Sequence, residues 1–175
     1  RAGAFRRFAD LVAGPHFFVM ALMFSELPPT APTSMPVVRA TRRVHFCAAH
    51  RLHRDEWSEE RNREVFGDCT NPNWHGHNYV LDVTVEGVVN SETGFVMDLK
   101  ELKDAMNTQV VDEVDHRNLN LEVSWLEGVM PSTENFAIAI WDQMAPALPD
   151  GVRLHRVFLR ETVNNAVEYM GPGEG

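Results

Sequence analysis

The part of the sequence that most limits the fold is residues 77–87, HNYVLDVTVEG, in which apolar and polar residues alternate. Successive side chains of a strand point to opposite faces, so one face here is apolar and the other polar. This pattern is typical of an antiparallel sheet that is packed on one side and solvated on the other. We therefore expect a half-exposed antiparallel strand. Its apolar face consists of Leu81, Val83 and Val85, and its polar face of Asp82, Thr84 and Glu86.

Two later segments have apolar residues at helical spacing. The first covers residues 98–114, with Asp98 as the expected N-cap and Glu101 placed as in a capping box. The second is expected to begin near Ser132 or Thr133 and to end at about residue 145. The apolar stripe of the first helix consists of Leu99, Leu102, Met106, Val110 and Val114.

The remaining patterns complete the fold class. We expect strands at residues 42–52, 152–162 and 166–171, and a short helix or a long excursion at residues 56–66. In the first strand, four residues share the inward face: Val44, Phe46, Ala48 and His50. The order strand, strand, helix, helix, strand, strand predicts an α+β fold, in which two helices cover one face of a four-stranded antiparallel sheet.

Residues 1–36 differ in composition from the rest of the chain. Residues 17–24 are apolar but too short to span a bilayer, and residues 25–36 are rich in proline, as in linkers. An arginine pair before the apolar run resembles a signal peptide faintly, but no small-residue cleavage site follows cleanly. We expect a poorly ordered N-terminal extension over residues 1–36 and one folded domain over residues 37–175. A further hypothesis is that Met35 is the natural start, which mass spectrometry of the native protein tests.

Composition narrows the classes of function. The chain has 175 residues, 44% of them hydrophobic, which is enough for one domain with a sizeable core. A formal net charge of -9 argues against binding along a nucleic-acid backbone. Two cysteines are too few for a disulfide framework, so we expect free thiols and a reducing cytoplasmic setting. The net charge and the shortness of the apolar run lead us to expect neither nucleic acid nor membrane as a partner. Cys47 lies on the strand face opposite His50 and is expected to be structural.

Three histidines form a candidate metal site. His75 and His77 are two residues apart in an extended segment, so their imidazoles point the same way. His50, on the inward face of the first strand, is the best candidate for a third ligand. Three histidines and one open position are typical of catalytic zinc, whereas structural zinc sites are closed and rich in sulfur. Two other interpretations stay open, namely a polar turn at the histidine pair and a hydrogen-bonded core histidine at His50.

Four further residues are candidates for a functional site. Cys69 lies in a loop of turn-forming residues, where a nearby metal would favour its thiolate, and the alternative is an inert loop cysteine. Asp115 and His116 follow a helix, and they suit either a proton relay or a histidine interacting with the helix dipole. Glu161 shares an apolar strand face, where an unpaired carboxylate is costly. It is therefore either salt-bridged in the core or able to hold adjacent N–H donors of a ligand.

Several motifs, taken together and in their order along the chain, resemble those of a known protein family. They are FCAAHRLH, FGDCTNPNWHGHNY, TGFVMDLKELK, VDHRNLN, STENFAIAIWD and ETVNNAVEYMG. Over residues 42–171 the chain resembles the family of 6-pyruvoyltetrahydropterin and 6-carboxytetrahydropterin synthases, which has the tunnelling fold. The resemblance implies a ββααββ domain whose trimers join their sheets into a barrel. It also implies a homohexamer made of two trimers, with sites at subunit interfaces.

The resemblance assigns roles to residues that match the family's motifs. It implies Zn²⁺ as cofactor and a reaction that converts 7,8-dihydroneopterin triphosphate into 6-pyruvoyltetrahydropterin with elimination of triphosphate. No nicotinamide is implied. The implied zinc ligands are His50, His75 and His77; the catalytic residues are Cys69, Asp115 and His116; and the substrate-binding residues are Glu161, which anchors the pterin, with Ser132, Thr133 and Glu134 near it.

The spacing between thiol and histidines separates two branches of the family. Five residues lie between Cys69 and His75, whereas the 6-carboxytetrahydropterin synthases of queuosine biosynthesis have a shorter spacing. This favours the pyruvoyl reaction, with the carboxy reaction as the alternative. A catalytically silent metal- or pterin-binding oligomer is a third interpretation, and the retained Cys69, Asp115 and His116 argue against it, since a pure binder needs none of them.

Two features are not fixed by the resemblance. Trp74 stands before His75 where relatives often carry glycine, and a bulky indole there would reshape the mouth of the pocket. The basic residues that would meet the triphosphate are also open. The candidates are Arg51, Arg54 and Lys100.

Overall fold

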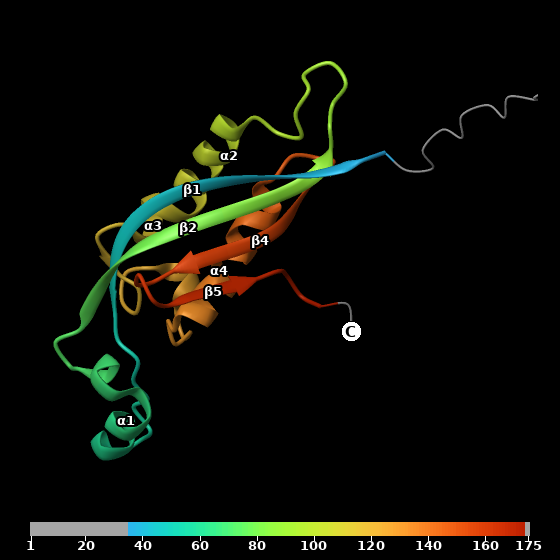
Figure 1. Cartoon of the computed structure of the whole chain (residues 1–175). Helices are drawn as coiled ribbons and strands as arrows, with labels where there is room; N and C mark the ends of the chain where they lie inside the picture. Colours follow the sequence, from blue (N-terminus) through green and yellow to red (C-terminus); the bar gives the residue numbers. More distant parts are fainter. Residues whose placement is uncertain (1–34, 174–175) are drawn as a thin grey trace, which may run out of the picture. The chain divides into compact units, whose positions relative to one another are not determined.

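The computed structural model describes residues 35–173 of the chain. The expectations for residues 1–34, including most of the proposed extension, lie outside the described residues. In chain order (Figure 1), the elements are β1 (Val37–His50), α1 (Glu59–Phe66), the 3₁₀ helix η1 (Gly67–Thr70), β2 (His75–Val88), α2 (Leu99–Met106), the π-helical turn η2 (Asn107–Val111), α3 (Asp112–Val114), β3 (Arg117–Asn118), η3 (Ser124–Leu126), α4 (Thr133–Met144), η4 (Ala145–Ala147), β4 (Val152–Arg160) and β5 (Ala166–Tyr169).

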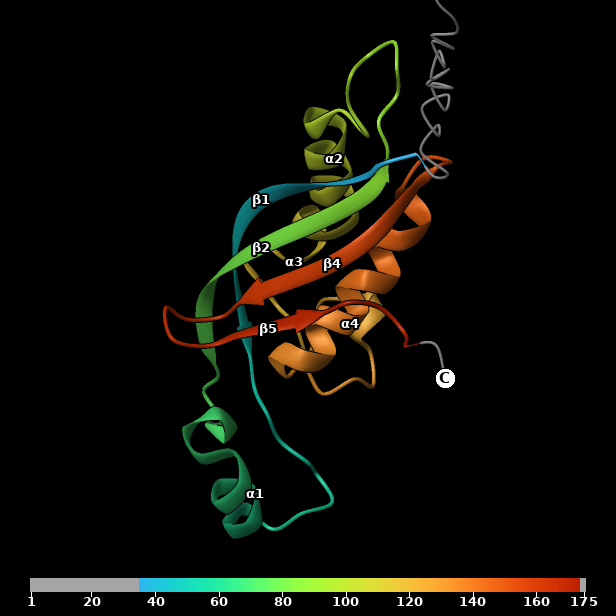
Figure 2. The ribbon, with the colours of Figure 1, turned by 45° about the vertical axis from the view of Figure 1, so that its right-hand side comes forward.

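The strands form one sheet with the order β3-β1-β2-β4-β5. β1, β2, β4 and β5 pair antiparallel, and β1 and β2 pair along their whole length, from Val37 opposite Val88 to His50 opposite His75. Figures 1 and 2 show α2 and α4 packed on one face of this sheet. The predicted α+β architecture is confirmed. The two-residue strand β3, parallel to β1, was not predicted, because it is too short to produce a periodic pattern.

The core lies between the sheet and the helices. The predicted apolar face of β2 is fully buried, with Leu81, Val83 and Val85 all at 0% exposure. Phe136 and Ile140 of α4 are also fully buried in the same core. The hydrophobic effect of burying these side chains, about 25 cal/mol per Å² of apolar surface, holds the helices on the sheet.

The opposite face of β2 is less exposed than the alternation predicts. Asp82 and Thr84 are buried, so the expectation of a half-exposed strand is wrong at these two positions. Arg43 of β1 covers Asp82 with two hydrogen bonds, from Nε to Oδ1 at 2.6 Å and from a terminal nitrogen to Oδ2 at 2.7 Å. The hydroxyl oxygens of Thr41 and Thr84 lie 2.8 Å apart. Long polar side chains therefore cover this face and satisfy its buried groups.

The helix predicted at residues 98–114 is interrupted. Asp98 is the N-cap as predicted, since its side chain accepts a hydrogen bond from the Lys100 N–H at 2.7 Å. After Met106 the chain forms the π-helical turn η2 before one last α-helical turn. Leu99 is 41% exposed and does not belong to the buried stripe. The helical segment ends at Val114, which places Asp115 and His116 directly after it.

In the described part of the chain, no helix combines the length and the apolar character that a membrane span needs.

Candidate functional site

The three predicted histidines converge at one end of the β1–β2 ladder. His50 is the last residue of β1 and pairs with His75, the first residue of β2, while His77 pairs with Ala48. The ring centroids are 4.5 Å apart for His50 and His75, 5.1 Å for His50 and His77, and 5.0 Å for His75 and His77. Each ring offers a nitrogen within 4.8 Å of the others. The antiparallel register alone thus brings together residues far apart in sequence.

The hydrogen bonding of these rings fits metal ligands. Nδ1 of His50 lies 2.8 Å from the carbonyl oxygen of Pro131, which fixes that nitrogen as the donor and leaves Nε2 without its proton. Nε2 of His50 and both ring nitrogens of His75 are buried without a hydrogen-bond partner among the described residues. Buried polar atoms are nearly always satisfied, so these orphaned nitrogens indicate a missing ligand, and one ion could bind one nitrogen from each ring.

Burial also favours the ligand form of the histidines. Desolvation lowers the pKa of His50, His75 and His77 below the ordinary histidine value, although Glu161 opposes the shift in each case. A lowered pKa keeps an imidazole neutral at neutral pH, and the neutral ring is the form that binds a metal. The donor set of three neutral imidazoles fits a zinc ion.

Glu161 reaches the same place from the end of β4. Its Oε1 lies 3.6 Å from Nε2 of His50 and 3.7 Å from Nε2 of His77. The hydroxyl of Thr133, the first residue of α4, donates a hydrogen bond to that oxygen at 2.7 Å. Ser132 caps the same helix by accepting a hydrogen bond from the Asn135 N–H at 3.3 Å. The N-terminus of α4 and the end of β4 therefore position the carboxylate together.

Cys69 lies on η1 and faces a cavity of about 380 Å³. The cavity is lined by His50, Cys69, Thr133 and Glu161, and also by Asn164 and Asn165 of the β4–β5 turn. Burial is the main cause that raises the pKa of the Cys69 thiol, with smaller effects from the charges of Glu161 and Asp68. Without a cation the thiol is thus protonated at neutral pH, and a nearby cation would favour the thiolate.

Asp115 and His116 do not line the cavity that Cys69 faces. Asp115 accepts a hydrogen bond from the Cys47 N–H at 2.8 Å, and its other oxygen is 3.0 Å from Nδ1 of His116. The Cys47 N–H is the main cause that lowers the pKa of Asp115. His116 lines a second cavity, of about 430 Å³, together with Cys47 and Arg117. In a single copy of the chain, His50, Cys69 and Glu161 line one cavity, whereas His116 lines another, to which His77 also contributes.

Some residues of these cavities were not singled out by sequence reasoning. Cys47 was assigned a structural role, yet its sulfur lies within 4.8 Å of ligand atoms of Asp115 and His116. Asn164 and Asn165 gave only a turn-like pattern, which does not reveal a cavity wall. Tyr79 continues the inward face of His75 and His77, and its buried hydroxyl has no partner in the described part of the chain.

The three basic candidates for a phosphate contact differ in availability. Arg51 donates from Nε to the Thr70 carbonyl oxygen at 2.8 Å, so its guanidinium is already engaged. Lys100 pairs with Asp104 at 2.6 Å on α2. Arg54 is exposed, with its guanidinium 5.7 Å from the centre of the Trp57 ring.

Known proteins with similar sequences cover most of the described domain. The family model described as 6-pyruvoyl tetrahydropterin synthase matches residues 39–172. The human protein named 6-pyruvoyl tetrahydrobiopterin synthase is 44% identical over 133 residues, which cover 76% of this chain and 91% of the relative. The Drosophila melanogaster protein of that name is 40% identical over 140 residues, covering 80% and 83%. A Pyrococcus furiosus relative named dihydroneopterin monophosphate aldolase is 36% identical over 130 residues, covering 74% and 95%.

Solved structures agree with the sequence comparisons. The Caenorhabditis elegans 6-pyruvoyl tetrahydropterin synthase superimposes with a TM-score of 0.74 at 40% identity, covering 79% of this chain and 98% of that chain. A Plasmodium vivax structure with the same description has a TM-score of 0.55 at 16% identity, covering 77% and 97%, which supports the fold alone.

Proposed function

Because the chain belongs to the 6-pyruvoyl tetrahydropterin synthase family, we propose that it is a lyase that converts 7,8-dihydroneopterin triphosphate into 6-pyruvoyltetrahydropterin with elimination of triphosphate. The observation that carries the proposal is a cluster of three histidines with Glu161 beside it, next to a cavity that His50, Glu161 and Cys69 line. A thiol and a carboxylate beside a metal-binding set give a cavity that can hold a heterocycle and move its protons.

We propose Zn²⁺ as the cofactor, held by His50, His75 and His77. When bound, zinc would act as a Lewis acid toward substrate oxygens and make protons on the adjacent carbons more acidic. The orphaned nitrogens of His50 and His75 support this assignment, and the Pro131 carbonyl sets the tautomer of His50.

Glu161 would orient the pterin. A carboxylate can accept two parallel N–H bonds, which fits the amino group and the neighbouring ring N–H of a pterin. The Thr133 hydroxyl, 2.7 Å from Oε1, would hold the carboxylate in one rotamer. Ser132 and Glu134 line the same cavity and would contribute to substrate binding. Fixing the ring places the side chain of the substrate for proton transfer.

Cys69 would act as the general base, and Asp115 with His116 would relay protons to and from it. Asp115 would orient His116 through Nδ1 and stabilise its charged form. Since Cys69 and His116 line different cavities of one chain, the relay would come from a neighbouring copy. We propose a homo-oligomer with sites at its interfaces, a hexamer formed as a dimer of trimers. Its free thiols fit a reducing cytoplasm.

Product analysis tests the proposed reaction. The full-length protein, loaded with zinc, is incubated anaerobically with 7,8-dihydroneopterin triphosphate, and the products are identified by mass spectrometry beside a Cys69→Ala control. We expect a pyruvoyl product with free triphosphate, and neither in the control. A carboxypterin with acetaldehyde would assign the chain to the queuosine-type reaction. Binding of zinc and pterin without turnover would indicate a binding protein.

A further inference from the structure

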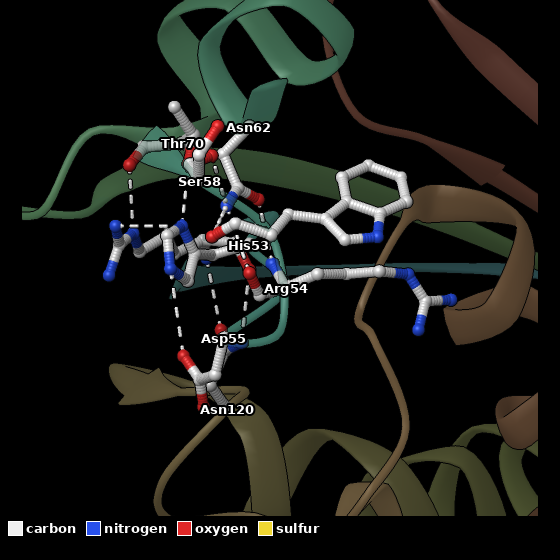
Figure 3. A network of polar contacts seen from close by, with 9 residues as sticks. His53, Arg54, Asp55, Ser58, Asn62, Thr70 and Asn120 are labelled. Atoms are coloured by element: carbon white, nitrogen blue, oxygen red, sulfur yellow. Dashed lines mark hydrogen bonds and ion pairs between the residues drawn. The ribbon is translucent and has the colours of Figure 1, made fainter. Parts of the chain in front are cut away.

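The loop that carries Cys69 is held by polar contacts. Four residues make these contacts, and Figure 3 shows the region around them. We call them the thiol support network: Arg51, His53, Thr70 and Asn120. Arg51 and His53 lie within three residues after His50, and Asn120 lies shortly after His116. The network therefore connects the segments that carry the proposed metal ligand, the thiol and the relay.

Arg51 and Leu52 hold the two peptide groups that directly follow the thiol residue. The Leu52 N–H donates to the carbonyl oxygen of Cys69 at 2.9 Å. Nε of Arg51 donates to the next carbonyl oxygen, that of Thr70, at 2.8 Å. Two consecutive carbonyl groups of η1 are thus tied to the chain just beyond His50, which fixes the distance between Cys69 and the histidine cluster.

Asn120 in turn holds the backbone of Arg51. Its Oδ1 accepts from the Arg51 N–H at 2.9 Å, and its Nδ2 donates to the Arg51 carbonyl oxygen at 3.0 Å. β1 ends at His50, so the Asn120 amide supplies the pair of hydrogen bonds that a neighbouring strand would have made. The Asn120 amide therefore keeps the backbone of Arg51 extended for one residue beyond β1. From this position the Arg51 side chain reaches η1.

His53 fixes the orientation of the guanidinium. A terminal nitrogen of Arg51 lies 3.0 Å from Nδ1 of His53, and the Thr70 hydroxyl oxygen lies 2.9 Å from the same Nδ1. Arginine can only donate, so Nδ1 is the acceptor and the ring proton is on Nε2, 3.6 Å from Oδ1 of Asp55. The Arg51 guanidinium is thus engaged on two sides by its own chain.

We propose that Arg51 and Asn120 are positioning residues that hold Cys69 at its working distance from the histidine cluster. This inference rests on the proposed function, because it assigns Cys69 a role in turnover. It differs from the expectation that Arg51 contacts the triphosphate, which would require a free guanidinium. The two roles make opposite demands on the side chain, since positioning needs a donor at the Nε position and phosphate binding needs the charge.

Two substitutions at Arg51 separate these roles. Arg51→Gln places an amide nitrogen where Nε was and keeps the bond to Thr70 without the charge, whereas Arg51→Met keeps the shape and removes the donor. We expect Arg51→Met to lower kcat by about 10- to 100-fold with little change in KM, the usual range for loss of a supporting contact. Arg51→Gln should stay within about threefold of the wild type. Arg63→Met, exposed on α1, is the matched control.

A second readout does not depend on turnover. The rate at which iodoacetamide alkylates Cys69, followed by peptide mass spectrometry, should rise at least about threefold in Arg51→Met and remain near wild type in Arg51→Gln, because a loosened thiol is more accessible. If wild type and variants all fail to turn over the substrate, the proposed function fails, and the alkylation rates still decide the positioning role. An equal rise of KM in both Arg51 variants, with unchanged alkylation, would overturn the proposal in favour of phosphate binding.

Asn120 provides an independent test if Arg51→Met does not fold. Asn120→Ala removes both bonds to the Arg51 backbone and no charge, so a direct effect on an anionic substrate is absent. We expect the same fall in kcat and rise in Cys69 alkylation, with zinc content unchanged. Wild-type values of both quantities in folded Asn120→Ala would overturn the proposal.

Discussion

His75 has two buried ring nitrogens that find no partner within the described residues, a costly arrangement unless a ligand occupies the site. We expect His75→Ala to lower the zinc content after dialysis from about one ion per chain to well below half, because only two imidazoles remain. Plasma mass spectrometry of the dialysed protein measures this. His45→Ala, on the exposed part of β1, should keep its zinc. Equal zinc contents in both variants would place the metal elsewhere.

Trp74 has a positive φ of 64°, an uncommon conformation for a bulky side chain. Glycine adopts this conformation without the steric cost of a Cβ, about 1 kcal/mol. We expect Trp74→Gly to have a free energy of unfolding about 1 kcal/mol higher than Trp74→Ala, since both lose the indole and only glycine relieves the backbone. Denaturant titration of the two variants checks this. A more stable alanine variant would mean that backbone strain does not matter at this position.

At the residue scale, the sequence predicted the strand face on which a side chain lies, because side chains alternate between faces with a period of two residues. It placed His50 on the inward face of its strand and His75 and His77 on one common face, and the register then brought the three together. It did not decide whether Glu161 was a core ion pair or a ligand contact, because its neighbours come from the start of α4. It also did not separate Cys69 from the Asp115–His116 pair. Such contacts depend on how loops pack, and side-chain periodicity does not encode that.

At the element scale, the N-terminus of α2 depends on one side chain. The Asp98 carboxylate accepts from the Lys100 N–H at 2.7 Å, whereas Glu101 has no capping bond in the described part of the structure. We expect Asp98→Ala to lower the free energy of unfolding by about 1 kcal/mol, and Asp98→Ser to lose much less. Glu101→Ala should change it by less than about 0.5 kcal/mol. Urea unfolding measures all three, and an equal loss in the Glu101 variant would indicate a complete capping box.

The long strands and the two main helices were predictable because each has a strong apolar period. The π-helical turn η2 was not, since Val110 and Val114 keep a spacing that an α-helix would also give. Burial of Asp82 and Thr84 was missed for a different reason. It depends on Arg43 reaching across from β1, a long-range pairing that the pattern of one strand does not contain.

At the scale of the whole molecule, the proposed catalytic residues are divided between two cavities of one chain. If neighbouring copies complete each other's sites, the inactive variants Cys69→Ala and His116→Ala should complement each other. Co-expressed in equal amounts, they should recover about a quarter of the wild-type activity, because a working site needs an intact contribution from each of two randomly chosen neighbours. Activity of the mixed oligomer measures this. No recovery in a folded mixed oligomer would place the complete site within one chain.

The segment between β1 and β2 carries Cys69 but contributes no apolar residue to the core of the described domain. Within residues 51–74 the only fully buried side chains are those of Asn62 and Thr70, both polar. Such a segment opens locally at a lower free energy than the whole domain. Its amides should exchange with deuterium faster than those of β2. On gentle warming, the thiol segment should therefore unfold locally before the domain melts. Catalysis should stop at that temperature and return on cooling, when the segment refolds.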